Sequence, residues 1–201
     1  MPIDYSQLGA FMTALIALVA SPGPVTLALA GAGAAFGLHR ARNFLFGSLC
    51  GAALTIALVG SGVVGALLGF PGLAPVLITS AAAYMVFLAY RIATAPPIGE
   101  TATSGRTPGF IAGFLLGIIN PKGYAVFAAL FSGFVVLPDD VFTDALVKGA
   151  LLMAMLITID VAWLVAGSAL RPIFHDPKIS RYVNIAFAIL LLASVALVVD
   201  L

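Results

Sequence analysis

The sequence has very little charge. Only 8% of its 201 residues are Asp, Glu, Lys or Arg, whereas a soluble domain usually carries about a quarter. Apolar residues make up 62% of the chain, too many for a surface that faces water. No polar stretch is long enough to form a second, soluble domain. The composition therefore predicts a membrane protein, in which each span needs about 20 apolar residues.

Other scarce residue types exclude further classes. Cys50 is the single cysteine, so no internal disulfide or dithiol pair is expected. The spans lack the clusters of His, Cys or carboxylates that hold metal ions, and nothing in the sequence calls for a cofactor. The net charge of +1 gives no indication of nucleic-acid binding. Residues 1–11 contain Asp4 and no basic residue, unlike a signal peptide, so we expect the first apolar segment to be retained.

Six apolar segments follow one another along the chain. They are expected at residues 7–36, 44–69, 74–94, 110–137, 145–170 and 182–199. Each should be a helix, because an isolated strand would leave its backbone polar groups unpaired in lipid. Glycines four residues apart could let helices approach closely, although glycine is also simply common in membrane helices. These glycines are Gly47 and Gly51, Gly65 and Gly69, and Gly109, Gly113 and Gly117.

The basic residues predict the orientation. With six spans, one side of the membrane carries Lys148 and five acids, and the other side carries seven basic residues. Lys and Arg accumulate on the cytoplasmic side, so both termini of this multi-pass protein should face outward. The seven residues are Arg40, Arg42, Arg91, Arg106, Arg171, Lys178 and Arg181.

The layout indicates an internal duplication. Three spans are an odd number, so a repeated three-helix unit must insert in the opposite direction. The longest loop, residues 96–108, divides a single transmembrane transporter domain into halves of about 1–95 and 108–201. The first loop of one half, "GLHRARN", is basic, and that of the other, "LPDDVFTD", is acidic. We therefore predict an all-α membrane protein of six transmembrane helices in two inverted three-helix repeats.

The first helix of each half is interrupted by proline. The interruptions are "LVASPGPVTLAL" at residues 18–29 and "GIINPKGYAVF" at 117–127. Ser21-Pro22 and Asn120-Pro121 have the residue types preferred at a helix N-cap and first position. Each therefore predicts a new helix inside the membrane, whose free N–H groups and positive dipole end can bind an anion. Paired breaks point to a transporter substrate site; the alternative is two proline kinks tolerated for packing.

Two charges lie at membrane depth. Lys122 follows the second break, and Asp160 lies in the middle of the fifth segment. A charge at the bilayer centre costs about 2.5–3.5 kcal/mol on insertion scales, so such residues usually face a cavity or a partner. An acid that can take up a proton suits proton coupling, whereas a structural Lys122–Asp160 pair is the alternative. Polar residues that could line the same cavity are Thr26, Thr55, Ser61, Tyr124 and Thr158.

These motifs resemble a known family. "SPGPVTLALAGAGAAFGLHRARNFLFGSLCG" and "GFLLGIINPKGYAVF" are similar to the two signatures of the LysE/RhtB-type amino-acid exporters, and an acid in the fifth segment fits their pattern. The resemblance implies a homodimer in the bacterial inner membrane that exports amino acids or their derivatives, driven by protons. The motif residues carried over are Pro22, Gly23, Pro24, Asn120, Pro121, Lys122 and Asp160. Val25 stands where the family commonly has Asn, and "FSGFVVLPDD" departs from its fourth-segment ending, which leaves the solute open.

The residues together predict an exporter of zwitterionic solutes by proton antiport. Asp160 is expected to take up protons and to contact the amino group of the solute. An intramembrane hydrolase would need a base beside its nucleophile, but His39 and His175 fall in expected loops. A membrane scaffold would leave Asp160 unexplained. The expected substrate-binding residues are Ser21, Pro22, Gly23, Pro24, Thr26, Asn120, Pro121 and Lys122.

Overall fold

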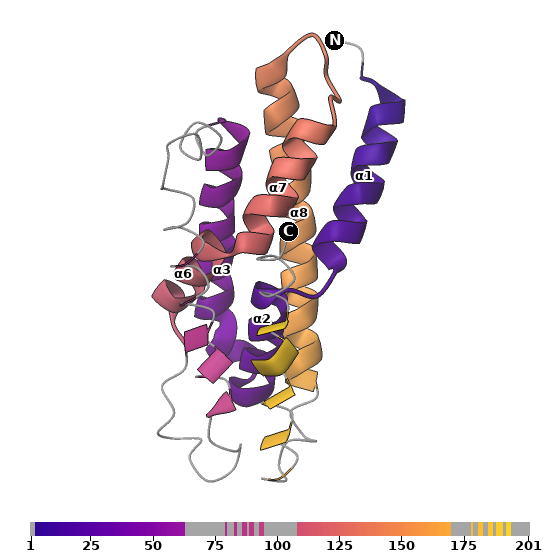
Figure 1. Ribbon diagram of the computed structural model, residues 1–201. Helices are drawn as coiled ribbons and strands as arrows, with labels where there is room; N and C mark the ends of the chain where they lie inside the picture. Colours follow the sequence, from indigo (N-terminus) through magenta and orange to yellow (C-terminus); the bar gives the residue numbers. More distant parts are fainter. Residues whose placement is uncertain are drawn as a thin grey trace.

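The computed structural model describes residues 3–62 and 108–169, with isolated positions between 79 and 94 and between 178 and 193. All regular structure in this part of the chain is helical (Figure 1), which confirms the predicted all-α class. The third and sixth expected segments, Gly65, Gly69 and His175 fall wholly or largely outside the described residues. The count of six spans and the repeat therefore stay predictions.

Two apolar spans are broken where the prolines predicted. The first consists of α1 (Tyr5–Ala20) and α2 (Pro24–Phe36), which meet at an angle of 49°. The second consists of α6 (Phe110–Ile119) and α7 (Pro121–Gly133), which meet at 52°. Each pair is long and apolar enough to cross a membrane as one bent span.

Two further helices are long enough to cross a membrane unbroken, α3 (Leu38–Gly60) and α8 (Val141–Ala169). The helix α3 corrects one prediction. "GLHRARN" is not a loop, because α3 begins directly after Gly37, so His39, Arg40 and Arg42 lie in its first turns. Gly37 alone makes the turn from α2, with a φ of 78° that favours glycine.

The start of α8 corrects a second prediction. The helix begins at Val141 and not near residue 145, so half of the expected acidic loop is helical. Asp140 explains the early start, because its carboxylate accepts hydrogen bonds from the N–H groups of Phe142 and Thr143, both at 3.0 Å. Hydrogen bonds from the Thr143 hydroxyl and N–H lower the pKa of Asp140. The ionised carboxylate then suits the positive end of the helix dipole.

The spans of the two halves run in opposite directions. In Figure 1 the chain descends through α1 and α2 and returns through α3, whereas it ascends through α6 and α7 and returns through α8. The N–H of Asp4 donates to the carbonyl of Val136 at 3.0 Å, which ties the N-terminus to the loop after α7. This direction reversal is the one that an inverted repeat requires.

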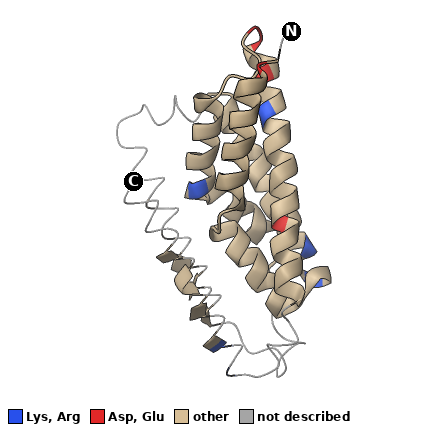
Figure 2. Cartoon of the chain, turned by 90° about the vertical axis from the view of Figure 1, so that its right-hand side faces the viewer, with Lys and Arg blue, Asp and Glu red and all other residues tan. Residues whose placement is uncertain are grey.

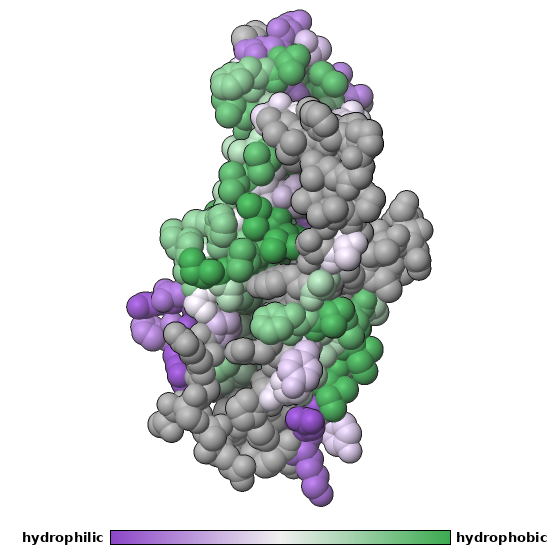
Figure 3. All heavy atoms as spheres, turned by 60° about the vertical axis from the view of Figure 1, so that its left-hand side comes forward, coloured by the Kyte–Doolittle hydropathy of each residue, from purple (hydrophilic) through white to green (hydrophobic). Residues whose placement is uncertain are grey.

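The two ends of the described bundle differ in charge (Figure 2). The acidic end carries Asp4, Asp139 and Asp140, and the basic end, at the opposite end of α3, carries Arg40 and Arg42. Between them, apolar side chains cover much of the face in Figure 3. Charged ends and an apolar middle are the pattern of a protein that spans a bilayer.

Two separate cores pack above and below the breaks. Near the acidic end, α1, α7 and α8 contribute Phe11, Leu130 and Leu152, all fully buried. Near the basic end, α2 and α3 contribute Leu29 and Phe44 to the second core. The unbroken helices α3 and α8 take part in both cores, so they hold the two layers in one bundle.

Glycine allows a close helix contact between α3 and α6. A Cβ atom at Gly113 would meet the carbonyl of Phe44 and lie 2.9 Å from the Ser48 nitrogen. Gly47, Gly51 and Gly117 are equally constrained by the backbone of the facing helix, whereas Gly109 faces open space. The predicted role of glycine in close helix packing is thus confirmed for Gly47, Gly51, Gly113 and Gly117.

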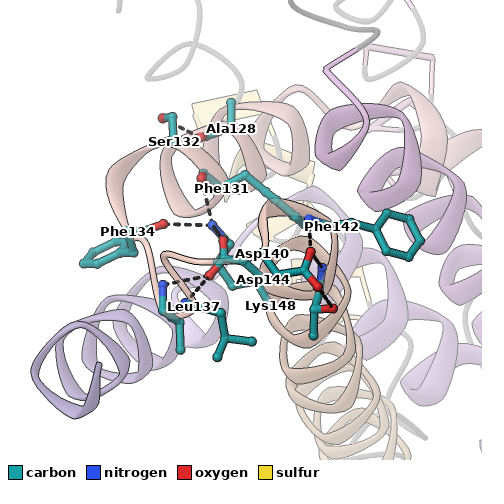
Figure 4. A network of polar contacts seen from close by, with 11 residues as sticks. Ala128, Phe131, Ser132, Phe134, Leu137, Asp140, Phe142, Asp144 and Lys148 are labelled. Carbon is teal, nitrogen blue, oxygen red and sulfur yellow. Dashed lines mark hydrogen bonds and ion pairs between the residues drawn. The ribbon is translucent and has the colours of Figure 1, made fainter. Parts of the chain in front are cut away.

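A buried ion pair fixes the acidic end (Figure 4). The ammonium of Lys148 lies 2.6 Å from Asp144, and it donates to the carbonyls of Phe131 and Phe134 at 3.0 and 2.8 Å. Asp144 in turn accepts the N–H groups of residues 136–137. The charge count placed Lys148 beside an outer loop. In the structure it is buried within α8, and Asp144, one turn earlier in the same helix, neutralises its charge.

Candidate functional site

Both breaks open on one cavity of about 50 Å³, enough for roughly three to five water molecules. Its polar lining comes from three different helices and the second break: Thr26 of α2, Asn120, Lys122 of α7 and Asp160 of α8. The cavity lies between the two apolar cores, where the broken spans change direction. Residues about a hundred positions apart in the sequence therefore share one site.

The first break differs from its predicted form. Ser21 does not cap the second helix; it ends α1, and its hydroxyl donates to the carbonyl of Leu18 at 2.7 Å. The helix α2 begins at Pro24, and Gly23 is its N-cap. A residue before proline avoids the helical conformation, so two prolines in "SPGP" keep both Ser21 and Gly23 extended.

Thr26 fills the capping role that was expected of Ser21. Its hydroxyl accepts the N–H of Gly23 at 2.8 Å and donates to the carbonyl of the same residue at 3.0 Å. Thr26 is buried and lines the cavity. It therefore holds the first break in shape from inside the site.

The second break has the predicted form but an uncapped end. Asn120 is the N-cap of α7 and Pro121 its first residue. The Asn120 side chain makes no capping bond, and its buried Oδ1 has no partner in the described part of the chain. The N–H groups of Lys122 and Gly123 likewise have no acceptor among the described residues. These unpaired donors are what an anion at a helix N-terminus needs.

Lys122 joins the two breaks. Its ammonium donates to the carbonyl of Ser21, to the Ser21 hydroxyl at 2.8 Å and to the Pro22 carbonyl at 3.4 Å. These groups follow the last turn of α1, where a helix dipole favours a cation. The Lys122 stem crosses Gly23 so closely that a Cβ there would lie 2.7 Å from its Cδ. A side chain at 23 would therefore have to displace the Lys122 stem.

Asp160 is buried and unpaired. It is 2% exposed and lines the cavity. Its carboxylate interacts electrostatically with the Lys122 ammonium, but no hydrogen bond or ion pair within 4.0 Å joins it to a residue that the structure describes. The expected alternative of a Lys122–Asp160 salt bridge is not found within 4.0 Å. A buried carboxylate without a hydrogen bond or a directly contacting cation is costly, so Asp160 is suited to receive a proton or a cation.

The predicted site residues fall into three groups. Gly23, Thr26, Asn120, Lys122 and Asp160 line the cavity. Ser21 and Pro22 reach it through their bonds to Lys122, whereas Pro24 and Pro121 begin the two inner helices.

Other polar residues play different parts. Thr55 is buried and bonds to the carbonyl of Gly51 in its own helix, and Ser61 and Thr158 likewise bond to carbonyls within one turn.

Sequence reasoning missed the apolar wall of the cavity. Gly123 and Phe127 line it from α7, and Leu156 lines it from α8. Helical spacing could have found Leu156, which lies four residues before the predicted site residue Asp160, but no such signal marks Gly123 and Phe127. Residues four apart share a helix face.

Broken apolar helices that run in opposite directions and meet at a cavity with one buried and one half-buried charge are typical of a membrane transport protein. The sequence comparison makes the assignment specific. Residues 16–199 match the family described as LysE type translocator, and the chain belongs to this family. Membership confirms the resemblance drawn from the two proline motifs and indicates a transporter, not an enzyme.

Relatives of known name support the same assignment. The chain is 30% identical to the cysteine/O-acetylserine efflux protein of Escherichia coli O157:H7 over 187 residues, which cover 92% of this chain and 93% of the relative. It is also 30% identical, over 186 residues and with the same coverage, to the proteins of that name from Escherichia coli K12 and Shigella flexneri. No solved structure matches the chain significantly.

Proposed function

We propose that the protein exports amino acids or amino-acid derivatives across the bacterial inner membrane in exchange for protons. The observation that carries this proposal is the unpaired Asp160 in a cavity shared with the uncapped start of α7. The relatives named as efflux proteins support the direction of transport. Their names make cysteine and O-acetylserine the first solutes to test.

The carboxylate of the solute would bind at the start of α7. The free N–H groups of Lys122 and Gly123 point along the helix axis at the cavity, and the positive dipole end favours an anion there. The Lys122 ammonium adds positive charge to the same side of the cavity while it stays bonded to Ser21. A carboxylate would thus meet donors that have no other acceptor among the described residues.

The amino group of the solute would bind Asp160. Because the Lys122 ammonium is held by the first break, the Asp160 carboxylate is available to a solute ammonium or to a proton. If the two compete for Asp160 during alternating access, inward proton flow drives outward solute flow. The coupling requires that Asp160 binds either the solute or a proton but not both, and that the cavity changes sides only when one of them is bound.

The charged ends support an orientation. We place the basic end, with Arg40 and Arg42, in the cytoplasm and the acidic end outside, in agreement with the usual distribution of Lys and Arg. The N-terminus lies at the acidic end and would face outward. In keeping with the family resemblance, the transporter would act as a homodimer of six-span, inverted-repeat chains, each with its own cavity.

The proposal is tested with purified protein in phospholipid vesicles loaded with radiolabelled cysteine, under reductant, or with O-acetylserine. With the vesicle exterior more acidic than the lumen, we expect rapid solute loss that an uncoupling proton carrier slows. If the rate of solute loss does not depend on the pH gradient, the protein is still an exporter, but the proposed proton antiport is wrong. No protein-dependent loss of any amino acid would reject the proposed function.

A further inference from the structure

The cavity has a charged side and an apolar side. Lys122 and Asp160 are the only charged residues among its described lining. The apolar part of the lining includes Val126 and Phe127 of α7, about one turn after Lys122, and Leu156 of α8, one turn before Asp160. If the charged side binds the amino and carboxylate groups, as in the proposed function, the apolar side receives the side chain of the solute.

Two residues on α7 limit the space on this apolar side. Phe127 is 4% exposed and closes the wall with its ring. Gly123, one turn earlier, has no side chain, and a Cβ there would lie 3.5 Å from the Asn120 amide nitrogen and 3.5 Å from the Phe127 ring. These are ordinary contact distances, so alanine would fit at 123 without moving its neighbours. Its methyl group would occupy space that the glycine leaves open.

We infer that Gly123 and Phe127 set the size of the side chain that the transporter accepts, and that its solutes are amino acids with short, uncharged side chains. The inference rests on the proposed function and assigns these residues a role in specificity. Gly123 leaves room for a few atoms beside the helix start, and Phe127 blocks longer chains.

Charge gives a second reason for this solute class. A lysine or glutamate solute would bring a third charge into the cavity. Asp160 and Lys122 would already face the main amino and carboxylate groups, and the rest of the lining that the structure describes carries no charge. An unpaired charge in such a site is costly. Basic and acidic amino acids should therefore be rejected.

An exchange assay tests the inference without any pH gradient. Vesicles with the wild-type protein, loaded with unlabelled alanine, are given trace radiolabelled solutes. We expect exchange of alanine, serine, cysteine and O-acetylserine, and little exchange of phenylalanine, lysine or glutamate. Gly123→Ala should lower the exchange rate of O-acetylserine relative to alanine by about tenfold, the usual effect of one methyl group in an apolar pocket.

Matched controls separate the cavity from general damage. Gly133→Ala makes the same change on the same helix, where a Cβ meets nothing within 4 Å, and should leave the rate ratio unchanged. Phe127→Leu should act in the opposite direction and admit leucine. Phe46→Leu removes the same ring atoms at a side chain that is 62% exposed and should admit no new solute.

The outcomes also distinguish the two proposals. Exchange of lysine or phenylalanine at the alanine rate by the wild-type protein would overturn this inference alone. So would an O-acetylserine to alanine ratio that Gly123→Ala leaves unchanged. If no amino acid exchanges at all, the proposed function fails together with the inference. Should Phe127→Leu not fold, the Gly123→Ala ratio decides the question without it.

Discussion

The ammonium of Lys122 lies 2.8 Å from the hydroxyl of Ser21, although the two residues are 101 positions apart. Lys122 belongs to the second break and Ser21 to the first. The contact therefore ties the two broken spans together at the cavity. If the start of α2 or α7 moved, this contact would have to change, so the two breaks are mechanically linked at the shared site.

The contact can be disturbed through Gly23. We expect Gly23→Ala to push the Lys122 stem off Ser21 and to lower transport strongly, because a Cβ at 23 would lie 2.7 Å from the Lys122 Cδ. Gly31→Ala, in the same helix α2 and with open space around its Cβ, should transport normally. Initial efflux rates from vesicles, corrected for the amount of inserted protein, make the comparison. Equal rates for the two variants would show that the Lys122–Ser21 contact is dispensable.

Asp160→Asn should abolish efflux driven by a pH gradient. Asparagine keeps the size of the side chain but cannot bind and release a proton, so the solute can no longer be coupled to proton flow. The exposed Asp139 offers the control, because Asp139→Asn changes the same charge far from the cavity. Proton uptake that accompanies solute loss, measured with a trapped pH dye, reports the coupling directly. Full gradient-driven efflux by Asp160→Asn would remove its coupling role.

A double variant separates coupling from structure. If Lys122 and Asp160 were only a structural pair, Asp160→Asn with Lys122→Met would restore what each single change lost, since no unpaired buried charge would remain. No ion pair joins them within 4.0 Å, so we expect the double variant to stay inactive in efflux assays. Near-normal proton-driven transport would favour the structural role.

Close contact through glycine should contribute to the stability of the described bundle. Gly113→Ala would place a Cβ 2.9 Å from the Ser48 nitrogen and against the Phe44 carbonyl. We expect this overpacking to cost about 1–3 kcal/mol and to lower the thermal unfolding midpoint in detergent. Gly109→Ala, where the Cβ meets nothing within 4 Å, is the matched control. Similar midpoints for both variants would contradict the close approach of α3 and α6.

The buried Asp144–Lys148 ion pair should contribute to the free energy of unfolding, although the sequence placed both residues at or beside an exposed loop. Asp144→Asn leaves the Lys148 ammonium, 3% exposed, without its ion partner, which should cost about 3 kcal/mol. Asp139→Asn, at an exposed position of the same loop, should have little effect. Thermal unfolding of both variants at one pH tests the difference. An unchanged midpoint for Asp144→Asn would mean that the pair contributes nothing net.

Orientation can be read by labelling single cysteines. In a variant whose Cys50 is replaced by alanine, a cysteine at Arg40 should react with a membrane-impermeant maleimide only after the cells are opened. A cysteine at Asp139, at the opposite end of the bundle, should react in intact cells. The reverse pattern would place the basic end outside.

Much of the bundle could be predicted from local signals. Pro22, Pro24 and Pro121 lack the backbone N–H that a continuous helix requires, so both breaks are written in the chain itself. Asp160 could be identified as a site residue because a charge in an apolar run is rare. Helix ends were harder. The start of α8 depends on the Asp140 cap and on Lys148 bonding to the end of α7, and that neighbour cannot be read from the spacing of apolar residues.

The partners of the charged residues also escaped prediction. The sequence offered Asp160 as the natural partner of Lys122, since both are charged and lie at similar depth. The structure instead pairs Lys122 with backbone carbonyls after α1. The C-terminal end of any helix has such free carbonyls, so no residue type in the sequence predicts which of them bind Lys122. The apolar wall of the cavity, at Gly123 and Phe127, was hidden for a similar reason, because apolar residues are everywhere in this sequence.

The breaks also change how thick a barrier the solute has to cross. The 13 residues of α2 or α7 make a helix about 20 Å long, shorter than the roughly 30 Å of bilayer hydrocarbon. A solute in the cavity is therefore separated from either side by only one short layer of packing, around Phe11 and Leu130 on one side and Leu29 and Phe44 on the other. The two apolar layers are thus two thin barriers in series, and α3 and α8 connect them because both helices take part in both cores.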